Sequence, residues 1–507
     1  MIYYCLEKGE EMRLGRQRFS TLWVSIGLLF VSILLLTFQL IGFSRSRATY
    51  PSGLTIGGIP VGGLDRQGAA DRLLEIYSLP VELRYGENLI HMEPAVVGFE
   101  LNLESMLATA DLARIGGPFW QEFWAFLWGN QDTPQPVPLD FTYSESQLRN
   151  YLNSEISSRY DQPAVPARAQ VGTTNIIPGS PGITINIDNA IVQIENALRS
   201  PILRSVNLPL HGTAPPRLSF QNLEIALKQA IQVANFDGIA GVYLLDLQTA
   251  QEVHFVIQNG QDVVIQPTDV TFTASSIIKI PIMVSAFRRI GEPPPEEAQN
   301  LLTGMIEASG NDPADWLMEQ FIDRFRGPLQ VTEDMQTLGL MNTFLAGYFR
   351  FGSPLMAIVR TPSNQRNDIS TDPDPYSQTT LTDIGMLLGD IYQCAENGGG
   401  SLSAVFPDQI SQQECQQMIS MLSRNLVPVL ITAGVPEGTQ VAHKHGWVSD
   451  LTGAINTIGD AGIIYTPSGN YVLVIYFNHP VQLVWEPIST LISDLSKIVY
   501  NTFNTTP

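Results

Sequence analysis

Lysine is rare in this chain, and two of its lysines stand where they could take part in acyl transfer. Only five of the 28 basic residues are lysine, at positions 8, 228, 279, 444 and 497. Lys279 follows Ser276 by three residues, and Lys444 precedes Gly446 by two at the start of a strand-like run. A buried lysine can lose its proton, whereas arginine stays charged. The pattern therefore predicts a serine nucleophile with a lysine base.

The local sequence predicts that Ser276 lies at the beginning of a helix. Residues 271–276 lead into an apolar segment that we expect to be helical from Ile277 to about Arg289. Residues three apart share a helix face, so Lys279 can reach Ser276. The first helical turn also offers free backbone N–H groups and a positive potential. We therefore expect Ser276 to be the nucleophile and Lys279 to accept its proton.

A third short motif lies between these two lysines. Residues 309–311 read Ser-Gly-Asn at the end of an expected helix. The segment after Lys444 ends in two expected strands, 460–465 and 471–477, which are joined by a Thr-Pro-Ser-Gly-Asn turn. The motifs thus occur in the order Ser-x-x-Lys, Ser-x-Asn, Lys-x-Gly. The alternative is three chance matches at unrelated positions.

This order of motifs resembles the penicillin-recognising serine hydrolases, and within them the class A β-lactamases. The resemblance covers residues 219–503 and implies an α+β fold, a β-lactamase/transpeptidase-like domain with an antiparallel sheet flanked by helices. It also implies a catalytic role for two further residues. Ser309 would relay a proton to the leaving nitrogen, and Lys444 would keep the site positive and attract a substrate carboxylate.

The remaining roles implied by the resemblance concern substrate binding. Asn311 would hold the substrate amide together with the lysine base. The backbone N–H groups of Ser276 and Trp447 would form the oxyanion hole. His445 and Gly446 would complete the substrate site.

The chain departs from the family pattern at residues that matter for turnover. His445 stands where the family has threonine, so an imidazole replaces the hydroxyl that contacts a substrate carboxylate. No glutamate occurs between residues 333 and 396, the span of the loop that carries the deacylating glutamate of class A enzymes. Asp368 and Asp372 lie in this loop, and Asp368 is one hypothesis for a substitute. Without such a base an acyl-enzyme would persist.

An apolar segment near the N-terminus predicts a membrane anchor. Residues 21–43 carry no charge and are long enough to span a bilayer as a helix. Basic residues are in excess before the segment, which favours an N-in, C-out orientation. A cleaved signal peptide is the alternative, although no Ala-x-Ala-like cleavage site follows. We expect residues 1–20 to be a cytoplasmic tail and 21–43 an uncleaved, single-pass signal anchor in the cell membrane.

Residues 50–212 predict a mixed α/β domain of short strands and helices. The segments GGIPVGGL at 57–64 and IPGSPGITINI at 177–187 resemble the peptidoglycan-binding domain found in VanW-like proteins and before some L,D-transpeptidases. The resemblance implies glycan binding, and a plain spacer is the alternative. A proline-bearing linker at 211–217 leads to the second domain, 219–503.

An aromatic segment inside this first domain has a helical period. Trp120, Trp124 and Trp128 recur every four residues and therefore share one helix face. We expect this face to be buried in the domain core, because no lysine or arginine lies on the opposite face. The alternative is a position in the headgroup region of a bilayer.

Net charge, cysteines and histidines bear on the partners, the disulfide bonding and the cofactors of the protein. The net charge of −21, with no basic stripe beyond the N-terminus, argues against nucleic acid as a partner. Cys394 and Cys415 would face an oxidising exterior, where we favour a disulfide over two buried thiols. His443 and His445 alternate on an expected strand, but no third ligand is near in sequence. We therefore expect no metal and no other cofactor.

Together these features predict a membrane-anchored, extracytoplasmic serine hydrolase. It would form an acyl-enzyme on Ser276 with β-lactams or with D-Ala-D-Ala-like peptides of peptidoglycan. One alternative is a catalytically silent protein that binds or senses peptidoglycan and keeps the fold. Another is a D,D-peptidase that turns over wall peptides.

Overall fold

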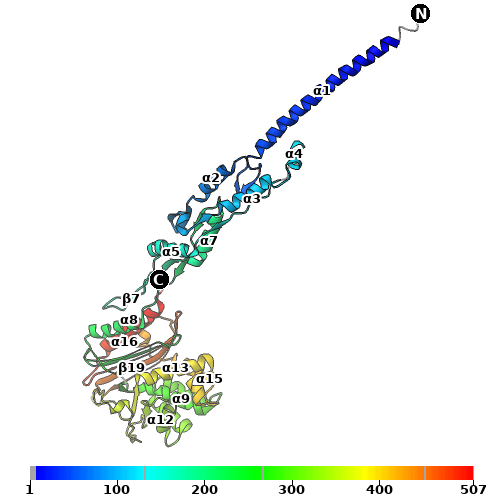
Figure 1. Ribbon diagram of the computed structural model, residues 1–507. Helices are drawn as coiled ribbons and strands as arrows, with labels where there is room; N and C mark the ends of the chain where they lie inside the picture. The colour runs from blue at the N-terminus through cyan, green and yellow to red at the C-terminus, as the bar shows by residue number, and fades with distance from the viewer. Residues whose placement is uncertain (1–6, 131–132, 265–267, 450–452, 506–507) are drawn as a thin grey trace. The chain divides into compact units, whose positions relative to one another are not determined.

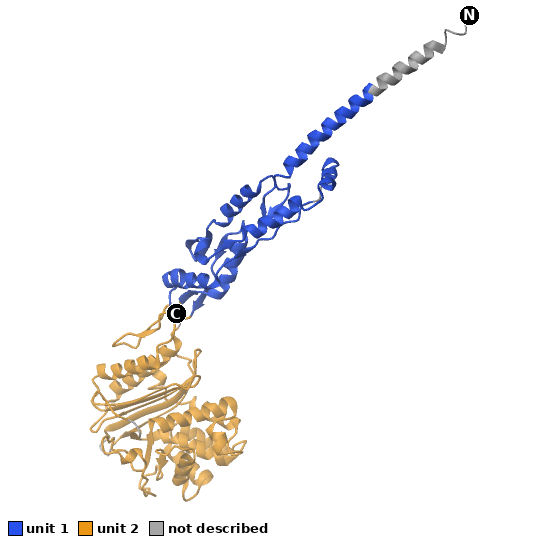
Figure 2. Cartoon of the chain, viewed as in Figure 1, with its two compact units in different colours: residues 1–163, 182–213 blue, residues 164–181, 214–507 orange. Residues whose placement is uncertain are grey.

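The chain forms two compact units. The computed structural model describes residues 7–130, 133–264, 268–449 and 453–505 (Figure 1). The first unit comprises residues 1–163 and 182–213, and the second comprises residues 164–181 and 214–507 (Figure 2). Each unit has its own hydrophobic core.

The first unit begins with a long helix, α1 (Glu7–Ser46). Its segment Trp23–Ser46 is long and apolar enough to cross a membrane. The rest of the unit is built from short elements. Its helices are α2 (Arg66–Tyr77), α3 (Leu103–Ile115), α4 (Phe119–Leu127), α5 (Glu145–Tyr151), α6 (Ser158–Tyr160) and α7 (Ile187–Arg199). Its strands are β1 (Thr55–Ile56), β2 (Ile59–Pro60), β3 (Val81–Tyr85), β4 (Asn88–Met92), β5 (Glu100–Leu101), β6 (Phe141–Thr142), β9 (Gly182–Ile185), β10 (Ser205–Asn207) and β11 (Leu210–Thr213).

A three-stranded sheet and helix α7 organise the core of the first unit. The strand order is β10-β3-β4, with β10 parallel and β4 antiparallel to β3. Helix α7 buries Ala190, Ile191, Ile194 and Leu198, which recur at three- and four-residue intervals along one face. The sequence prediction of a mixed α/β arrangement matches these elements.

Helix α4 corrects one expectation. Trp120, Trp124 and Trp128 share a face as predicted, but they are 61%, 50% and 77% exposed. Phe123 is the buried aromatic residue of this helix. Phe43 of α1 packs against Phe123 of α4. Because this side of α4 faces α1, the tryptophans lie on the exposed side.

The second unit is an α+β fold around a six-stranded antiparallel sheet of order β14-β13-β12-β20-β19-β18. These strands are β12 (Ile239–Asp246), β13 (Glu252–Gln258), β14 (Gln261–Asp262), β18 (Val441–Ser449), β19 (Ile455–Ile464) and β20 (Tyr471–Asn478), and shorter strands are β7 (Arg168–Ala169), β8 (Ile176–Ile177), β15 (Thr271–Thr273), β16 (Phe344–Leu345) and β17 (Ser377–Thr380). The helices are α8 (Phe220–Val233), α9 (Lys279–Ile290), α10 (Glu296–Ile306), α11 (Asn311–Leu317), α12 (Gly327–Thr337), α13 (Leu381–Asn397), α14 (Ser401–Val405), α15 (Gln412–Leu422) and α16 (Trp485–Asn504).

The two faces of this sheet are covered by different helices, because side chains alternate along each strand. Val242 and Leu244 of β12 pack in the cluster that holds α8 and α16. Tyr243, between them, packs in the larger cluster that holds α9, α13 and α15. Figure 1 shows the sheet between these two sets of helices. The predicted antiparallel sheet flanked by helices is therefore confirmed.

The hairpin β7–β8 joins the second unit, although its sequence lies inside the predicted first domain, 50–212. Ala169 and Ile176 pack against the cluster of α8 and α16. Asn501 of α16 also donates a hydrogen bond to the Thr174 carbonyl at 2.9 Å. Burial of these apolar side chains against the two helices accounts for the difference.

Candidate active site

Ser276 lies in a tight turn at the start of α9. A single 3₁₀ turn, Ser275–Ile278, precedes the α-helix, which begins at Lys279. Ser275 has a φ of 47°, a left-handed conformation that a non-glycine residue adopts only when its surroundings hold it there. Such conformations cluster at functional sites. The helical geometry keeps Lys279 on the side of Ser276, as the three-residue spacing predicts.

The Lys279 amine is the hub of the site. Its Nζ lies 2.9 Å from the Ser276 Oγ, 2.8 Å from the Ser309 carbonyl oxygen and 2.8 Å from the Asn311 Oδ1. The Ser309 Oγ lies further away, at 3.5 Å. The structure thus brings together residues that lie up to 35 positions apart in the first two motifs.

The Lys279 amine can make these contacts in its charged state and in its neutral state. A neutral lysine amine has two N–H groups and one lone pair, so it can donate to the two carbonyl oxygens of Ser309 and Asn311. The lone pair is then left to accept the Ser276 hydroxyl proton. Burial and the charge of Lys444 lower the pKa of Lys279 to about 7, against a smaller opposing effect of Asp315. The neutral form is therefore well populated at neutral pH.

The Ser-Gly-Asn motif forms the connection between α10 and α11. Ser309 has a φ of 56°, so a second residue of the site has left-handed backbone. A Cβ on Gly310 would lie 2.9 Å from the Pro313 side chain, which explains why glycine fits here in place of a larger residue. Asn311 begins α11 and points its amide oxygen at Lys279.

Lys444 and Gly446 lie on β18, the edge strand of the sheet. Lys444 is fully buried, and burial lowers its pKa to about 8, although Asp460 acts in the opposite direction. Gly446 packs against the turn Ser275–Ile278, which we call the nucleophile turn because it holds the proposed nucleophile Ser276. A Cβ at this position would lie 2.6 Å from the Ser276 backbone nitrogen and 2.5 Å from the Ser275 Oγ. Only glycine allows the strand to approach the Ser276 N–H this closely.

His445 is buried and neutral. Burial lowers its pKa to about 4. The Asn425 Oδ1 accepts a hydrogen bond from the Val427 N–H at 3.1 Å, so the Asn425 Nδ2 is the group that faces the His445 Nδ1 at 3.2 Å. The His445 Nδ1 therefore accepts, and the ring proton is on Nε2. The ring stacks on Trp447 with a centroid distance of 5.3 Å.

His443 takes part in a separate polar cluster. Its Nδ1 lies 2.9 Å from the Asp460 Oδ1, and its Nε2 lies 3.0 Å from the Thr432 Oγ1. Asp460 also accepts the Ile431 N–H at 3.1 Å. The two histidines thus lie near each other on β18, but each is held by its own protein partners.

Three residues that support the site carried no signal in the sequence. Asn425, in the loop after α15, contacts His445, and Asp460, on the neighbouring strand β19, contacts His443. Asp315 accepts the N–H groups of Phe349 and Arg350 at 2.9 Å each, and the Phe349 ring centre lies 5.2 Å from the Lys279 amine. Only the fold brings these residues to the site.

Asp368, in the loop before β17, is paired with an arginine. The Asp368 Oδ1 accepts the Arg366 Nε at 3.0 Å, and this pairing holds the pKa of Asp368 below its usual value. The Asp368 side chain is 61% exposed. The Asp372 N–H donates to the Ser370 Oγ at 3.2 Å. The arginine pairing thus occupies the Asp368 carboxylate, whereas the Asp372 contact is made by its backbone.

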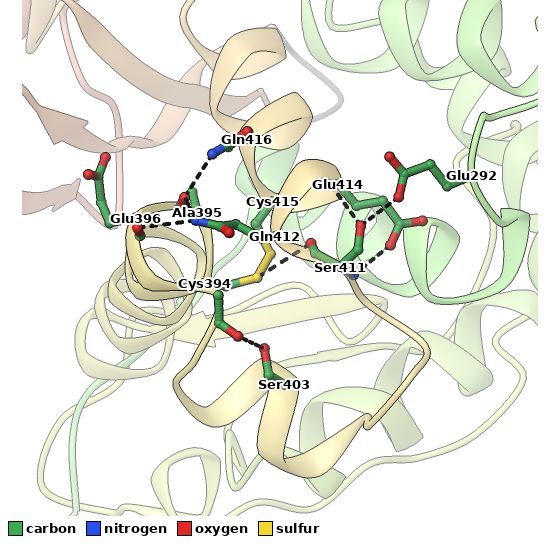
Figure 3. The surroundings of a disulfide bond; sticks show 11 residues. Glu292, Cys394, Ala395, Glu396, Ser403, Ser411, Gln412, Glu414, Cys415 and Gln416 are labelled. Atoms are coloured by element: carbon green, nitrogen blue, oxygen red, sulfur yellow. Dashed lines mark hydrogen bonds between the residues drawn. A yellow bond between two sulfur atoms is a disulfide. The ribbon is translucent and has the colours of Figure 1, made fainter.

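A disulfide joins Cys394 of α13 to Cys415 of α15, with Cα atoms 5.9 Å apart. Figure 3 shows the side chains around it. Gln412 and Gln416 of α15 donate to the Ala395 carbonyl at 3.0 and 3.1 Å. These bonds satisfy a free carbonyl at the end of α13, so covalent and polar contacts fix the same junction.

The site and the sheet together define the class of this protein as a β-lactamase-type serine hydrolase fold. Residues 296–503 match the model of the beta-lactamase enzyme family. This match includes Ser309 and Lys444 and begins after Ser276. Residues 90–206 match the model described as "Putative peptidoglycan binding domain". Both resemblances predicted from the sequence are thereby confirmed.

Solved structures that match this chain include PBP-A and β-lactamases. The structure of PBP-A is 20% identical, with a TM-score of 0.39, and the match covers 58% of this chain and 100% of that chain. A β-lactamase from Desulfarculus baarsii is 17% identical, with a TM-score of 0.40 over 57% and 99% of the two chains. An ancestral class A β-lactamase is 19% identical, with a TM-score of 0.39 over 55% and 100%. A search of curated proteins found no match.

Proposed function

We propose that this chain is a membrane-anchored, extracytoplasmic serine hydrolase that forms an acyl-enzyme on Ser276 with β-lactams or D-Ala-D-Ala-like wall peptides. The observation that carries the proposal is the buried Lys279 amine 2.9 Å from the Ser276 Oγ. Its lowered pKa makes it a base at neutral pH.

Acylation begins at the contact between the Ser276 hydroxyl and the Lys279 amine. The Ser276 Oγ attacks the carbonyl carbon of the substrate and passes its proton to the Lys279 Nζ. The C–N bond of the lactam or peptide then breaks, and an ester to Ser276 remains. The proton travels from Lys279 to the leaving nitrogen through the Ser309 Oγ, which lies 3.5 Å from the amine. Lysine is neutral again at the end of the step.

The edge strand β18 supplies the electrostatic part of the reaction. The Ser276 and Trp447 N–H groups stabilise the charge that develops on the carbonyl oxygen. Gly446 permits this geometry, because it lets the strand reach the nucleophile turn. Lys444 keeps the potential of the site positive and attracts a substrate carboxylate. His445 offers a neutral ring in place of a hydroxyl, and Asn311 holds the substrate amide.

Deacylation is slow in this proposal. Asp368 is exposed and paired with Arg366, so in this proposal it does not replace the missing glutamate. The ester on Ser276 then persists, and the protein traps β-lactams rather than destroying them.

In this proposal the reaction takes place at the cell wall. Helix α1 acts as an uncleaved signal anchor with the N-terminus inside, supported by its apolar segment and the basic residues before it. The first unit binds peptidoglycan, supported by the family match over residues 90–206.

Labelling with a fluorescent penicillin tests the proposal. The parent protein is expected to carry one stable label, and Ser276→Ala is expected to carry none. Ser285→Ala is the matched control, because Ser285 lies on the same helix and its buried hydroxyl has no hydrogen-bond partner among the residues that the structure describes. Equal labelling of Ser276→Ala and the parent would refute the assignment. A parent that takes no label and cleaves no wall peptide would favour a silent wall-binding protein.

A further inference from the structure

The exposed tryptophans of α4 form an apolar face without a cover in the described part of the chain. Trp120, Trp124 and Trp128 line one side of the helix and its end. Leu112 and Ile115, in the last turns of α3, are also exposed. Soluble proteins rarely present such a concentration of large apolar side chains unless it meets a partner.

The opposite side of α4 packs against the last turns of α1. Phe43 is almost fully buried, and its ring centre lies 5.3 Å from that of Phe119, 5.5 Å from that of Phe123 and 5.3 Å from that of Phe126. Four aromatic rings therefore form the junction between the two helices.

Polar contacts hold the same junction. The Arg47 guanidinium lies 3.4 Å from the Glu122 carboxylate and 5.4 Å from the centre of the Phe119 ring. Arg114 of α3 donates to the Ala48 carbonyl at 3.1 Å. These contacts fix the C-terminal end of α1 to α3 and α4. Helix α4 therefore has a defined position along the axis of α1.

Helix α4 packs on α1 close to the end of the apolar segment Trp23–Ser46. Phe43 precedes Ser46, where the segment ends, by three residues, or about 5 Å along a helix. A helix packed on Phe43 therefore lies at the boundary between acyl chains and headgroups when α1 spans a bilayer. Tryptophan is enriched at this level, and interfacial helices bury their apolar face there by about 5–10 Å.

We propose that α4 lies in the headgroup region of the membrane that α1 enters and inserts Trp120, Trp124 and Trp128 into it. The inference rests on the proposed anchoring by α1 and adds a second, peripheral contact with lipid. The single acidic residue of α4, Glu122, is bonded to Arg47 and to the Gly117 N–H, and the helix carries no basic residue. The contact therefore needs no anionic lipid.

Fluorescence quenching by brominated lipid tests the proposal on the full chain in phosphatidylcholine vesicles. Bromines placed near the headgroup end of the acyl chain are expected to quench the parent strongly. The variant W120F/W124F/W128F keeps aromatic rings but is expected to lose most of this quenching, leaving the share of Trp23. W316F is the matched control, because Trp316 is also exposed but belongs to the second unit.

The outcomes separate the α4 contact from the anchor. A parent that floats with vesicles but is quenched no more than the triple variant overturns the α4 contact and leaves the anchor intact. A parent that does not float overturns both. Unchanged quenching together with a shift of the triple variant from dimer to monomer would assign the tryptophan face to a second copy of the chain. Quenching that needs anionic lipid would contradict the apolar character of the contact.

Discussion

The Lys279 amine lies 2.9 Å from the Ser276 Oγ, with two carbonyl acceptors occupying its other hydrogen-bonding directions. When the amine is neutral, it can donate to these two oxygens and keep a lone pair for the Ser276 hydroxyl proton. Burial is the larger cause of the lowered pKa, and the charge of Lys444 is the second. In the proposed mechanism, the reactivity of Ser276 depends on a lysine that the fold keeps out of water.

The first prediction concerns pH. Only the neutral Lys279 can accept the Ser276 proton, and the neutral form predominates above its pKa of about 7. The second-order rate of labelling by a fluorescent penicillin should therefore rise with pH and reach half its plateau near pH 7. Lys279→Arg should reduce the rate by about 10²- to 10⁴-fold, because arginine keeps its proton. A parent rate that is independent of pH around neutrality would contradict the role of Lys279 as base.

The second prediction concerns the coupling between the two lysines. The positive charge of Lys444 lowers the pKa of Lys279. Lys444→Met removes this charge, so the midpoint of the pH–rate profile should move to higher pH. Lys444→Arg keeps the charge and should leave the midpoint closer to that of the parent. The measurement is the same labelling rate over a pH series, and a downward shift in Lys444→Met would exclude the coupling.

The third prediction concerns the approach of β18 to the nucleophile turn. Gly446→Ala places a Cβ 2.6 Å from the Ser276 nitrogen, so either the strand or the turn must move. Loss of one oxyanion-hole donor costs about 10²- to 10³-fold in rate, and a comparable fall in acylation is expected. The added variant Ser275→Ala should not rescue it, because the backbone nitrogen remains in the way. Gly399→Ala is the control, because open space surrounds that glycine.

Local and distant parts of the site differ in how far the sequence predicts them. The pairing of Ser276 with Lys279 follows from three residues of helix, and the strands 460–465 and 471–477 follow from alternation and a turn. The pairing of β12 with β20 joins residues more than 200 positions apart, and no local pattern encodes it. Asn425 and Asp460 lie only 20 and 17 positions from the histidines that they contact. The sequence pattern gives neither the register of β18 on β19 nor the course of the loop after α15, so these contacts were not predicted.

Helix α4 illustrates a different limit. The four-residue period of its tryptophans correctly predicts that they share a face. It does not determine whether that face is buried, because α4 also carries phenylalanines on its other side, and Phe123 is the one that is buried. Phe43 of α1 packs against Phe123, so the phenylalanine side of α4 is the buried one. A helical period therefore identifies a face, and the partner element determines which face is covered.

The fourth prediction concerns deacylation. Asp368 is bound by Arg366 and exposed, so Asp368→Asn should leave both the labelling rate and the lifetime of the label unchanged. The lifetime is measured by following loss of the fluorescent label after excess penicillin is removed. Asp65→Asn is a control for the removal of one carboxylate, since Asp65 caps α2 in the first unit. A label that becomes much longer-lived in Asp368→Asn would identify Asp368 as the missing base.

The fifth prediction concerns the bond between α13 and α15. Cys394 and Cys415 are separated by 21 positions, and a disulfide that closes a loop of this size contributes about 3 kcal/mol. The double variant Cys394→Ser/Cys415→Ser should therefore lower the free energy of unfolding of the second unit by about this amount. At denaturant concentrations well below the unfolding transition, the double variant should still be labelled at Ser276. The reason is that Gln412 and Gln416 of α15 also contact α13.

Chemical denaturation followed by labelling competence measures this difference. The parent in the presence of a reductant should unfold like the double variant, whereas Cys5→Ser should unfold like the oxidised parent. If reduction leaves the parent unchanged, the bond does not stabilise the second unit. The polar contacts of Gln412 and Gln416 with the Ala395 carbonyl would then be sufficient to hold the end of α13 against α15, and Gln412→Ala should show the larger loss of stability instead.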